Sequence, residues 1–264
     1  MRPATLTSMN VDPEIARRLL HNRDVRTAHG WGDVRDLQGA LSVTSDAPIP
    51  GLNSLHGFNV RERELDALLD VGFALLRAFD RDPAVEVTPL DRPKTLRRHL
   101  ARRRLVCAVQ GSWMVHDPAA PPIARNPDVE VRLGGPDDIR AFAAIVGGSE
   151  PWARRLCAAS AVNAMQQPGN YYYLGCLDGM PVSTLHMLID GATAGIYAVN
   201  TLRAHRRKGI SSTVMARAIA DARAAGCDLI GLGCEANGYA ERLYARQGFT
   251  RVFTSEMWTL PAAE

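Results

Sequence analysis

The stretch "RAHRRKGISSTVMARAIADARAAG" (Arg203–Gly226) has the pattern that predicts most about the fold. Basic residues come first, and Gly209 follows them as the only glycine between positions 196 and 225. Gly226 stands where a glycine commonly ends a helix. Between the two glycines, apolar or small residues recur every four positions, as on the buried face of a helix: Ile210, Val214, Ala218 and Ala222. The stretch therefore predicts a turn at Gly209 and a helix that ends before Gly226.

The start of this helix has the chemistry of a phosphate-binding turn. A glycine lets the backbone bend tightly and present its amides without a Cβ in the way. The first helical turn offers unpaired N–H groups and the positive end of the helix dipole, which together bind phosphate. Basic and hydroxyl side chains nearby supply further donors: Arg206, Arg207, Lys208, Ser211 and Ser212. The stretch matches neither G-x-x-x-x-G-K-[ST] nor G-x-G-x-x-G, and a loop glycine beside a solvated basic patch is the alternative interpretation.

The residues on both sides of this helix predict a sheet flanked by helices. Three strand-like runs between residues 170 and 202 are joined by Asp178-Gly179 and Asp190-Gly191. An Asp-Gly pair between apolar runs is typical of a hairpin, so we expect an antiparallel meander there. A short strand, a helix capped by Asn237 and a last extended run follow. The expected order after residue 127 is βααβββαβαβ.

The proline-rich segment Asp117–Pro127 predicts a boundary between two parts of the chain, residues 1–126 and residues 127–264. A length of 264 residues suits two domains better than one. From Arg61 onward the first part has the order helix, strand, helix, strand, which repeats the order at the end of the second. No glycine-rich helix start accompanies it. We therefore expect the first part to be a divergent copy of the fold of the second.

The bulk composition excludes several classes of protein. The net charge is only +3, so overall charge predicts no nucleic-acid partner. The five cysteines are odd in number and show no C-x-x-C spacing, which indicates neither a disulfide framework nor a zinc site. The first residues lack the apolar region of a secretory signal, and no apolar run reaches the length of a membrane span. The cytoplasm is the expected compartment, with no membrane partner.

Several motifs in order resemble the GNAT superfamily of acyl-CoA N-acyltransferases. R-x-x-G-x after a strand is followed by a helix ending in Ala-Gly, a strand, and N-x-x-A-x-x-L-Y-x-x-x-G-F. The matching residues are Arg206, Gly209, Asn237, Ala240, Leu243, Tyr244, Gly248 and Phe249. The resemblance spans about residues 129–260, and it departs at Ser211, where the family usually has glycine or alanine. It implies an α/β (α+β) GNAT fold, with a mixed, twisted sheet flanked by helices. The catalytic domain would lie behind a divergent GNAT-like half, as in tandem GNAT proteins.

The same resemblance implies acetyl-CoA, or another acyl-CoA, as the co-substrate. In the family the fourth and fifth strands splay apart and the pantetheine arm lies in the gap. Val199 and Thr201 would then offer backbone hydrogen bonds to that arm, although simple strand pairing is the alternative for both. The amides of residues 207–212, including that of Ile210, would hold the pyrophosphate, with Asn237 nearby. The first half, which lacks such a helix start, is expected to bind no CoA.

Tyr244 is the expected general acid, since the family's tyrosine at this place protonates the leaving CoA thiolate. Packing beside Leu243 is its alternative role. Glu235 is the candidate general base, ahead of His186, and ordered water can take that part instead. Cys234 offers a nucleophile, but cysteine is also among the residues most often buried, and we expect it to pack.

The expected function is transfer of an acetyl or other short acyl group from acyl-CoA to an amine, a small molecule or an amino-acid derivative. Two alternatives stay open: an unusual carrier such as an aminoacyl-tRNA or a carrier-protein thioester, and a non-catalytic acyl-CoA-binding regulator. The basic run Leu96–Leu105 would form the docking face for a tRNA. Its leucines instead predict a packed helix whose arginines face solvent. The sequence does not indicate the acceptor or the oligomeric state.

Overall fold

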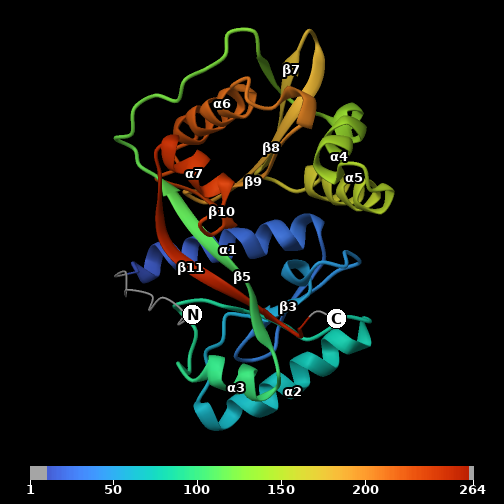
Figure 1. Ribbon diagram of the computed structural model, residues 1–264, viewed down its shortest axis with the longest axis vertical. Coiled ribbons are helices and arrows are strands. Elements are labelled where there is room, and N and C mark those ends of the chain that lie inside the picture. Colours follow the sequence, from blue (N-terminus) through green and yellow to red (C-terminus); the bar gives the residue numbers. More distant parts are fainter. Residues whose placement is uncertain (1–10, 262–264) are drawn as a thin grey trace.

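The computed structural model describes residues 11–261, which form one eleven-stranded mixed sheet with helices on both faces (Figure 1). The strands are β1 (Asp33–Asp36), β2 (Leu41–Thr44), β3 (Ser54–His56), β4 (Ala84–Val87), β5 (Val106–His116), β6 (Glu130–Leu133), β7 (Asn170–Leu177), β8 (Met180–Asp190), β9 (Thr193–Thr201), β10 (Leu229–Glu235) and β11 (Phe249–Thr259). Their order across the sheet is β1-β2-β3-β4-β11-β5-β10-β9-β8-β7-β6. The pairs β3–β4 and β9–β10 are parallel and the other pairs are antiparallel. The sheet is therefore mixed, as the sequence predicts.

The α-helices are α1 (Pro13–Gly30), α2 (Glu62–Ala78), α3 (Leu96–Arg102), α4 (Ile139–Gly147), α5 (Pro151–Met165), α6 (Ile210–Ala224) and α7 (Tyr239–Arg246). Short 3-10 turns cover η1 (Pro50–Leu52), η2 (Pro136–Asp138) and η3 (Arg203–His205). Between residues 11 and 261, none of the helices is both long enough and apolar enough to cross a membrane.

The second half confirms the expected order, with elements β6-α4-α5-β7-β8-β9-α6-β10-α7-β11. The hairpins at Asp178-Gly179 and Asp190-Gly191 form where the sequence predicts them. Helix α6 follows Gly209 and ends before Gly226, which has a φ of 84°. The expected cap at Asn237 is wrong: Gly238 is the N-cap of α7, and Asn237 lies before it in a turn with a φ of 60°.

The last strand of each half lies beside the last strand of the other half, in the middle of the sheet. Strand β5 pairs with β11 from Val106 opposite Thr259 to His116 opposite Phe249. On its other side β11 pairs with β4 of the first half, and β5 pairs with β10 of the second. Figure 1 shows β5 and β11 running from one half into the other. Exchanging the halves leaves the order β4-β11-β5-β10 unchanged, so the two halves are related by an approximate twofold axis.

Each half therefore completes its part of the sheet with a strand of the other. The predicted boundary at residues 126/127 falls in the segment between β5 and β6, which contains no helix or strand, and it stays a prediction. The first half does repeat the expected helix, strand, helix, strand order as α2-β4-α3-β5. Strands β1 to β3, which come before it, are not anticipated by the sequence pattern.

Helix α1 belongs to the first half of the sequence but packs on the second half (Figure 1). Its buried Ala16 and Leu19 lie in one apolar cluster with Trp113 of β5 and Leu229 of β10. Helix α6 covers the opposite face, where Ile230 and Leu232 of β10 point into its core. The chain region around β9 and β10 is therefore enclosed by α6 on one face and by α1 on the other.

Candidate active site

The sheet opens between β9 and β10. Four residue pairs join these parallel strands, and the last of them is Ile196 with Leu232. Beyond this pair β9 continues to Thr201 and stays paired with β8, while β10 continues to Glu235 and pairs with β5. A bulge, at which Ala198 has a φ of 48°, shifts the register of β9 on β8 at this point. The splay that the family resemblance implies is therefore present.

Beside this gap, at the end of β9, lies a cleft of about 650 Å³ on the α6 face, a volume within the usual range for small-molecule sites. The cleft brings together the end of β9, the turn before α6, the first turn of α6 and one side of α7. Its lining residues are Val199, Asn200, Thr201, Arg203, His205, Arg206, Arg207, Gly209, Ile210, Ser211, Ser212, Tyr239, Ala240, Leu243 and Tyr244. Most of the residues proposed from the sequence to bind the co-substrate thus meet in one place.

The turn at the start of α6 presents its backbone amides without a side-chain cap. Gly209 is the N-cap residue with a φ of 72°, and no side chain bonds to the free amides of the first turn. A Cβ at Gly209 would meet only the Cβ of Asn126, at an ordinary 3.5 Å. The backbone angle rather than lack of space therefore requires glycine there. Asn126 braces the turn, since its Nδ2 donates to the Lys208 carbonyl at 2.8 Å.

Basic and hydroxyl groups surround these amides. The Nε of Arg206 donates to the Thr201 carbonyl at 3.1 Å, which fixes that arginine beside the end of β9. The Oγ of Ser212 accepts a hydrogen bond from Gln247 at 2.9 Å, so its own proton remains available for an anion. Arg203 and His205 add positive or donor groups that sequence reasoning missed. Lys208, which was expected to take part, is not among the residues that line the cleft.

Tyr244 is the acidic group of the cleft. It projects from α7, is only 8% exposed, and packs edge-on against Phe249 with ring centres 5.9 Å apart. Burial, with a smaller contribution from Cys234, raises the pKa of Tyr244 to about 12. The phenol is therefore protonated at neutral pH and can donate a proton or a hydrogen bond. This geometry is compatible with both the packing role and the acid role.

Two further predicted residues, Glu235 and Asn237, also lie outside the cleft lining. Glu235 ends β10 with an exposed side chain. Alternation along the strand puts it on the face of Gly231, whose Cβ position abuts Leu19 of α1, and hence away from α6. Asn237 directs its Oδ1 to Arg251, which donates to it at 3.0 Å. Asn237 therefore has a structural partner.

The weaker candidates are also located. His186 is buried away from the cleft, stacked on Tyr172, with its Nε2 2.9 Å from the Oδ1 of Asn170. Burial holds the pKa of His186 well below its usual value. Burial likewise raises the pKa of Cys234 to about 11, and its Sγ lies 4.0 Å from the sulfur of Met114. A neutral, packed thiol is a poor nucleophile, which agrees with the expected packing role.

Three arginines in or directly after α3 are paired with acids of their own protein. Arg97 donates to Glu256 at 2.7 Å and Arg98 donates to Glu62 at 2.9 Å. Arg103 bonds to Asp66 and Asp70 of α2. Beneath them Leu96, Leu100 and Leu105 are buried in the core of the first half. This arrangement is that of a packed helix with paired, solvated charges.

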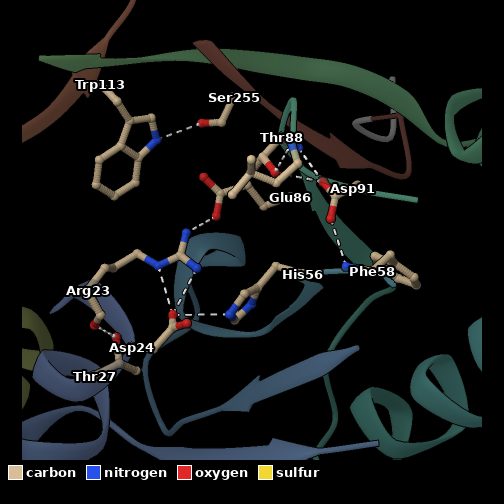
Figure 2. A network of polar contacts seen from close by, with 11 residues as sticks. Arg23, Asp24, Thr27, His56, Phe58, Glu86, Thr88, Asp91, Trp113 and Ser255 are labelled. Atoms are coloured by element: carbon tan, nitrogen blue, oxygen red, sulfur yellow. Dashed lines mark hydrogen bonds and ion pairs between the residues drawn. The ribbon is translucent and has the colours of Figure 1, made fainter. Parts of the chain in front are cut away.

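On the opposite face of the sheet, below the gap, α1 contributes a buried polar network (Figure 2). Arg23 pairs with its neighbour Asp24 and with Glu86 of β4. The Nε2 of His56 lies 3.1 Å from the Oδ1 of Asp24. Arg23 also lies over the ring of Trp113, 5.7 Å from its centre. Sequence reasoning missed this network because its members come from α1, β3, β4 and β5.

Residues 139–249 match the acetyltransferase (GNAT) family. The fold resembles a GCN5-related N-acetyltransferase from Kribbella flavida, with a TM-score of 0.72, 20% identity and 95% of each chain covered. It also resembles a tandem GNAT protein from the clavulanic acid biosynthesis pathway, with a TM-score of 0.65, 12% identity, and 96% of this chain and 97% of that chain covered.

A third likeness is to a GCN5-related N-acetyltransferase from Sphaerobacter thermophilus, with a TM-score of 0.62 and 15% identity. It covers 85% of this chain and 81% of that one. No curated protein matches the chain in sequence. The chain therefore has the GNAT fold over most of its length, and its residues 139–249 match the GNAT acetyltransferase family.

Proposed function

We propose that the protein transfers an acetyl or other short acyl group from acyl-CoA to an amine. The observation that carries this proposal is that the end of β9, beyond the last pair of Ile196 with Leu232, lines the cleft that holds both the start of α6 and Tyr244. A gap between strands admits an extended arm. The uncapped turn suits a pyrophosphate, and a protonated phenol suits a leaving thiolate. The three features occur in one cleft.

The residues of the cleft fit the charge of the co-substrate. The amides of residues 207–212 would hold the pyrophosphate, and the positive end of α6 and the side chains of Arg206 and Arg207 favour anions there. Backbone groups of Val199 and Thr201 would bind the pantetheine arm, although the Thr201 carbonyl already accepts from Arg206. Lys208 and Asn237, which lie outside the cleft lining, are the least supported members of the proposed set.

In the proposed reaction, the acceptor amine attacks the thioester carbon, the carbon–sulfur bond breaks, and a thiolate leaves. Tyr244 donates its proton to that thiolate. A phenol with a pKa of about 12 is a weak acid for a thiol, whose ordinary pKa is about 8.5. The burial that raises the pKa of the phenol acts on the thiol as well, and this narrows the difference. Glu235, on the α1 face, would take the proton of the amine directly or through water.

Two measurements test the proposal together. Calorimetry with acetyl-CoA measures binding, and release of free thiol in the presence of a panel of amines measures transfer. We expect one binding event and thiol release that depends on the amine. Binding without thiol release for any amine would favour a non-catalytic acyl-CoA-binding regulator. Lack of binding would exclude acyl-CoA as the co-substrate. The acids that already pair with Arg97, Arg98 and Arg103 disfavour the docking of a tRNA.

A further inference from the structure

Two arginines of α1 lie over the two sides of the gap between β9 and β10. Tyr197 is the first residue of β9 beyond the last pair with β10, and the guanidinium carbon of Arg26 lies 4.6 Å from the centre of its ring. On the other side, Arg23 lies over Trp113, whose ring packs 3.7 Å from the Cβ position of Gly233. Gly233 is the first residue of β10 beyond the same pair. One turn of α1 therefore spans the opening on the face away from α6.

The charges of these two arginines are balanced differently. Arg23 pairs with Asp24 and Glu86, as Figure 2 shows. Burial opposes its charge, but the two carboxylates outweigh burial and hold its pKa above the usual value. For Arg26, no carboxylate or other hydrogen-bond acceptor between residues 11 and 261 bonds to the guanidinium. Its Nε is buried without a partner, and burial lowers its pKa.

The guanidinium of Arg26 contacts aromatic rings instead of acids. Its guanidinium lies between Tyr197 and Trp31, 4.6 Å and 5.3 Å from the ring centres. The Tyr197 hydroxyl donates to Asn22 at 2.7 Å, so this ring is held in place. Such rings attract the cation, but they do not satisfy its N–H groups. The residue as a whole is half-buried, and its guanidinium is an ordered cation whose charge no carboxylate of the described residues compensates.

We propose that Arg26 binds an anionic group of the acceptor, so that the substrate is a compact amine that also carries a carboxylate or a phosphate ester. This inference rests on the acyltransfer proposed above. The co-substrate cleft lies on the α6 face, and the acceptor amine must reach the same gap. The α1 face is the other side of that gap, and Arg26 lies directly on the residue at its apex. The amine and the anionic group are therefore separated by only a few bonds.

The anion would supply the negative charge and the hydrogen-bond acceptors that Arg26 lacks in the fold. A planar guanidinium pairs with a carboxylate or a phosphate through two parallel hydrogen bonds, and the unpartnered N–H groups are available for it. The neighbouring Arg23 cannot bind the anion in this way, because its guanidinium already forms ion pairs with Asp24 and Glu86. The first half of the chain would thus supply the determinant of specificity for chemistry performed by the second.

Matched pairs of amines test this with thiol release from acetyl-CoA. L-phenylalanine is compared with phenethylamine, L-leucine with isopentylamine, and O-phosphoethanolamine with ethanolamine. We expect the anionic member of at least one pair to be preferred by at least about tenfold in kcat/KM, which is the scale of one lost charged contact. The pair that shows the preference distinguishes a carboxylate from a phosphate ester.

The variant Arg26→Met should raise the KM of the preferred anionic acceptor by at least about tenfold and leave kcat within a few-fold. Arg26→Lys should restore part of that affinity. The Tm of Arg26→Met should be equal to that of the wild type or higher, because the methionine removes a half-buried cation that no acid compensates. The control is Arg17→Met, an exposed arginine of the same helix that pairs only with Glu14. It should leave all these values unchanged.

The outcomes separate the two levels of the proposal. Turnover of amines without preference for the anionic members would overturn the role of Arg26 and leave the acyltransfer intact. An unchanged KM in Arg26→Met, with a lower Tm, would show that the arginine serves packing only. Binding of acetyl-CoA with no turnover of any amine would instead overturn the acyltransfer itself.

Discussion

The hydroxyl of Tyr197 on β9 donates to the side chain of Asn22 on α1, at 2.7 Å, directly beyond the last residue that pairs β9 with β10. The Nδ2 of Asn22 in turn donates to the carbonyls of Leu188 and Thr193. A helix from the first half of the chain is thus hydrogen-bonded to the strand that borders the proposed site in the second. This relationship places α1 of the first half directly against the strand that borders the proposed site.

The two halves of the chain should not fold independently of each other. Without β5, residues 127–264 would leave β10 and β11 with no strand between them. We expect this fragment to be insoluble or unfolded, because unpaired strand edges and the apolar surface under α1 would be exposed. Limited proteolysis in the segment Asp117–Pro127 should instead leave two pieces that elute together from a sizing column. A fragment 127–264 with a cooperative thermal transition would contradict this.

The conformation of Gly209 should be required for CoA binding. A valine there must adopt a φ near 72°, at a cost of about 1–2 kcal/mol, or move the amides of the turn. The matched control is Gly179→Val, in a hairpin turn with a φ of 77° and open space at the Cβ position. Both variants should lose similar stability in thermal melts. Only Gly209→Val should weaken CoA binding in calorimetry, by at least about tenfold, or about 1.4 kcal/mol.

One molecule of CoA should bind per chain. Helix α2, the first-half counterpart of α6, begins with Glu62 and Glu64, and the Glu64 side chain accepts from the Arg61 amide. Acidic groups at a helix start repel phosphate. The approximate twofold axis relates β5 to β11, with Val106 equivalent to Phe249 and His116 to Thr259. The same offset makes Ala101 equivalent to Tyr244, so the first half has no tyrosine at the matching position. Calorimetric stoichiometry near two, with equal sites, would refute this expectation.

Much of the second half could be predicted because its signals are local. The Asp-Gly turns, the four-residue repeat of α6 and the glycines at its ends each specify structure within a few residues. The family resemblance, rather than these local signals, predicted that Gly209 and Tyr244 belong to one site. The caps were less predictable: Asn237 is a preferred cap residue, but its side chain bonds to Arg251 and Gly238 takes the cap.

The parts of the fold that the sequence did not predict depend on contacts between residues that are far apart in the chain. β1 to β3 have only three or four residues each, too few for an alternating pattern to be distinctive. The sequence of β5 predicts a strand whichever neighbour it pairs with. Its pairing with β11 of the other half therefore has no signal in the local sequence. Helix α1 is polar enough to suggest a solvated helix. Its arginines and Asn22 take on a role only when the fold brings β9 and β10 beneath them.

Replacing the Tyr244 hydroxyl should separate the acid role from the packing role. Tyr244→Phe keeps the ring against Phe249 and removes only the proton donor. If the hydroxyl protonates the leaving thiolate, kcat should fall by about 10²-fold or more, or about 2.7 kcal/mol, with KM and CoA affinity nearly unchanged. Tyr171→Phe, which alters a partly exposed tyrosine of β7, is the control and should keep full activity. Weak CoA binding and a low Tm would support packing alone.

The pH dependence gives a second signature of the same group. Burial raises the pKa of Tyr244 to about 12, against about 10 in an unfolded chain. The native state therefore binds this proton more tightly, and the corresponding stability is complete below about pH 10 and lost as the pH rises toward 12. The acid should also remain protonated across the working range. We expect the kcat of the wild type to show no alkaline loss attributable to this phenol up to about pH 10, whereas Tyr244→Phe should be slow at every pH. An alkaline limb that starts near pH 9 in the wild type and vanishes in Tyr244→Phe would show that the site does not hold the proton in this way.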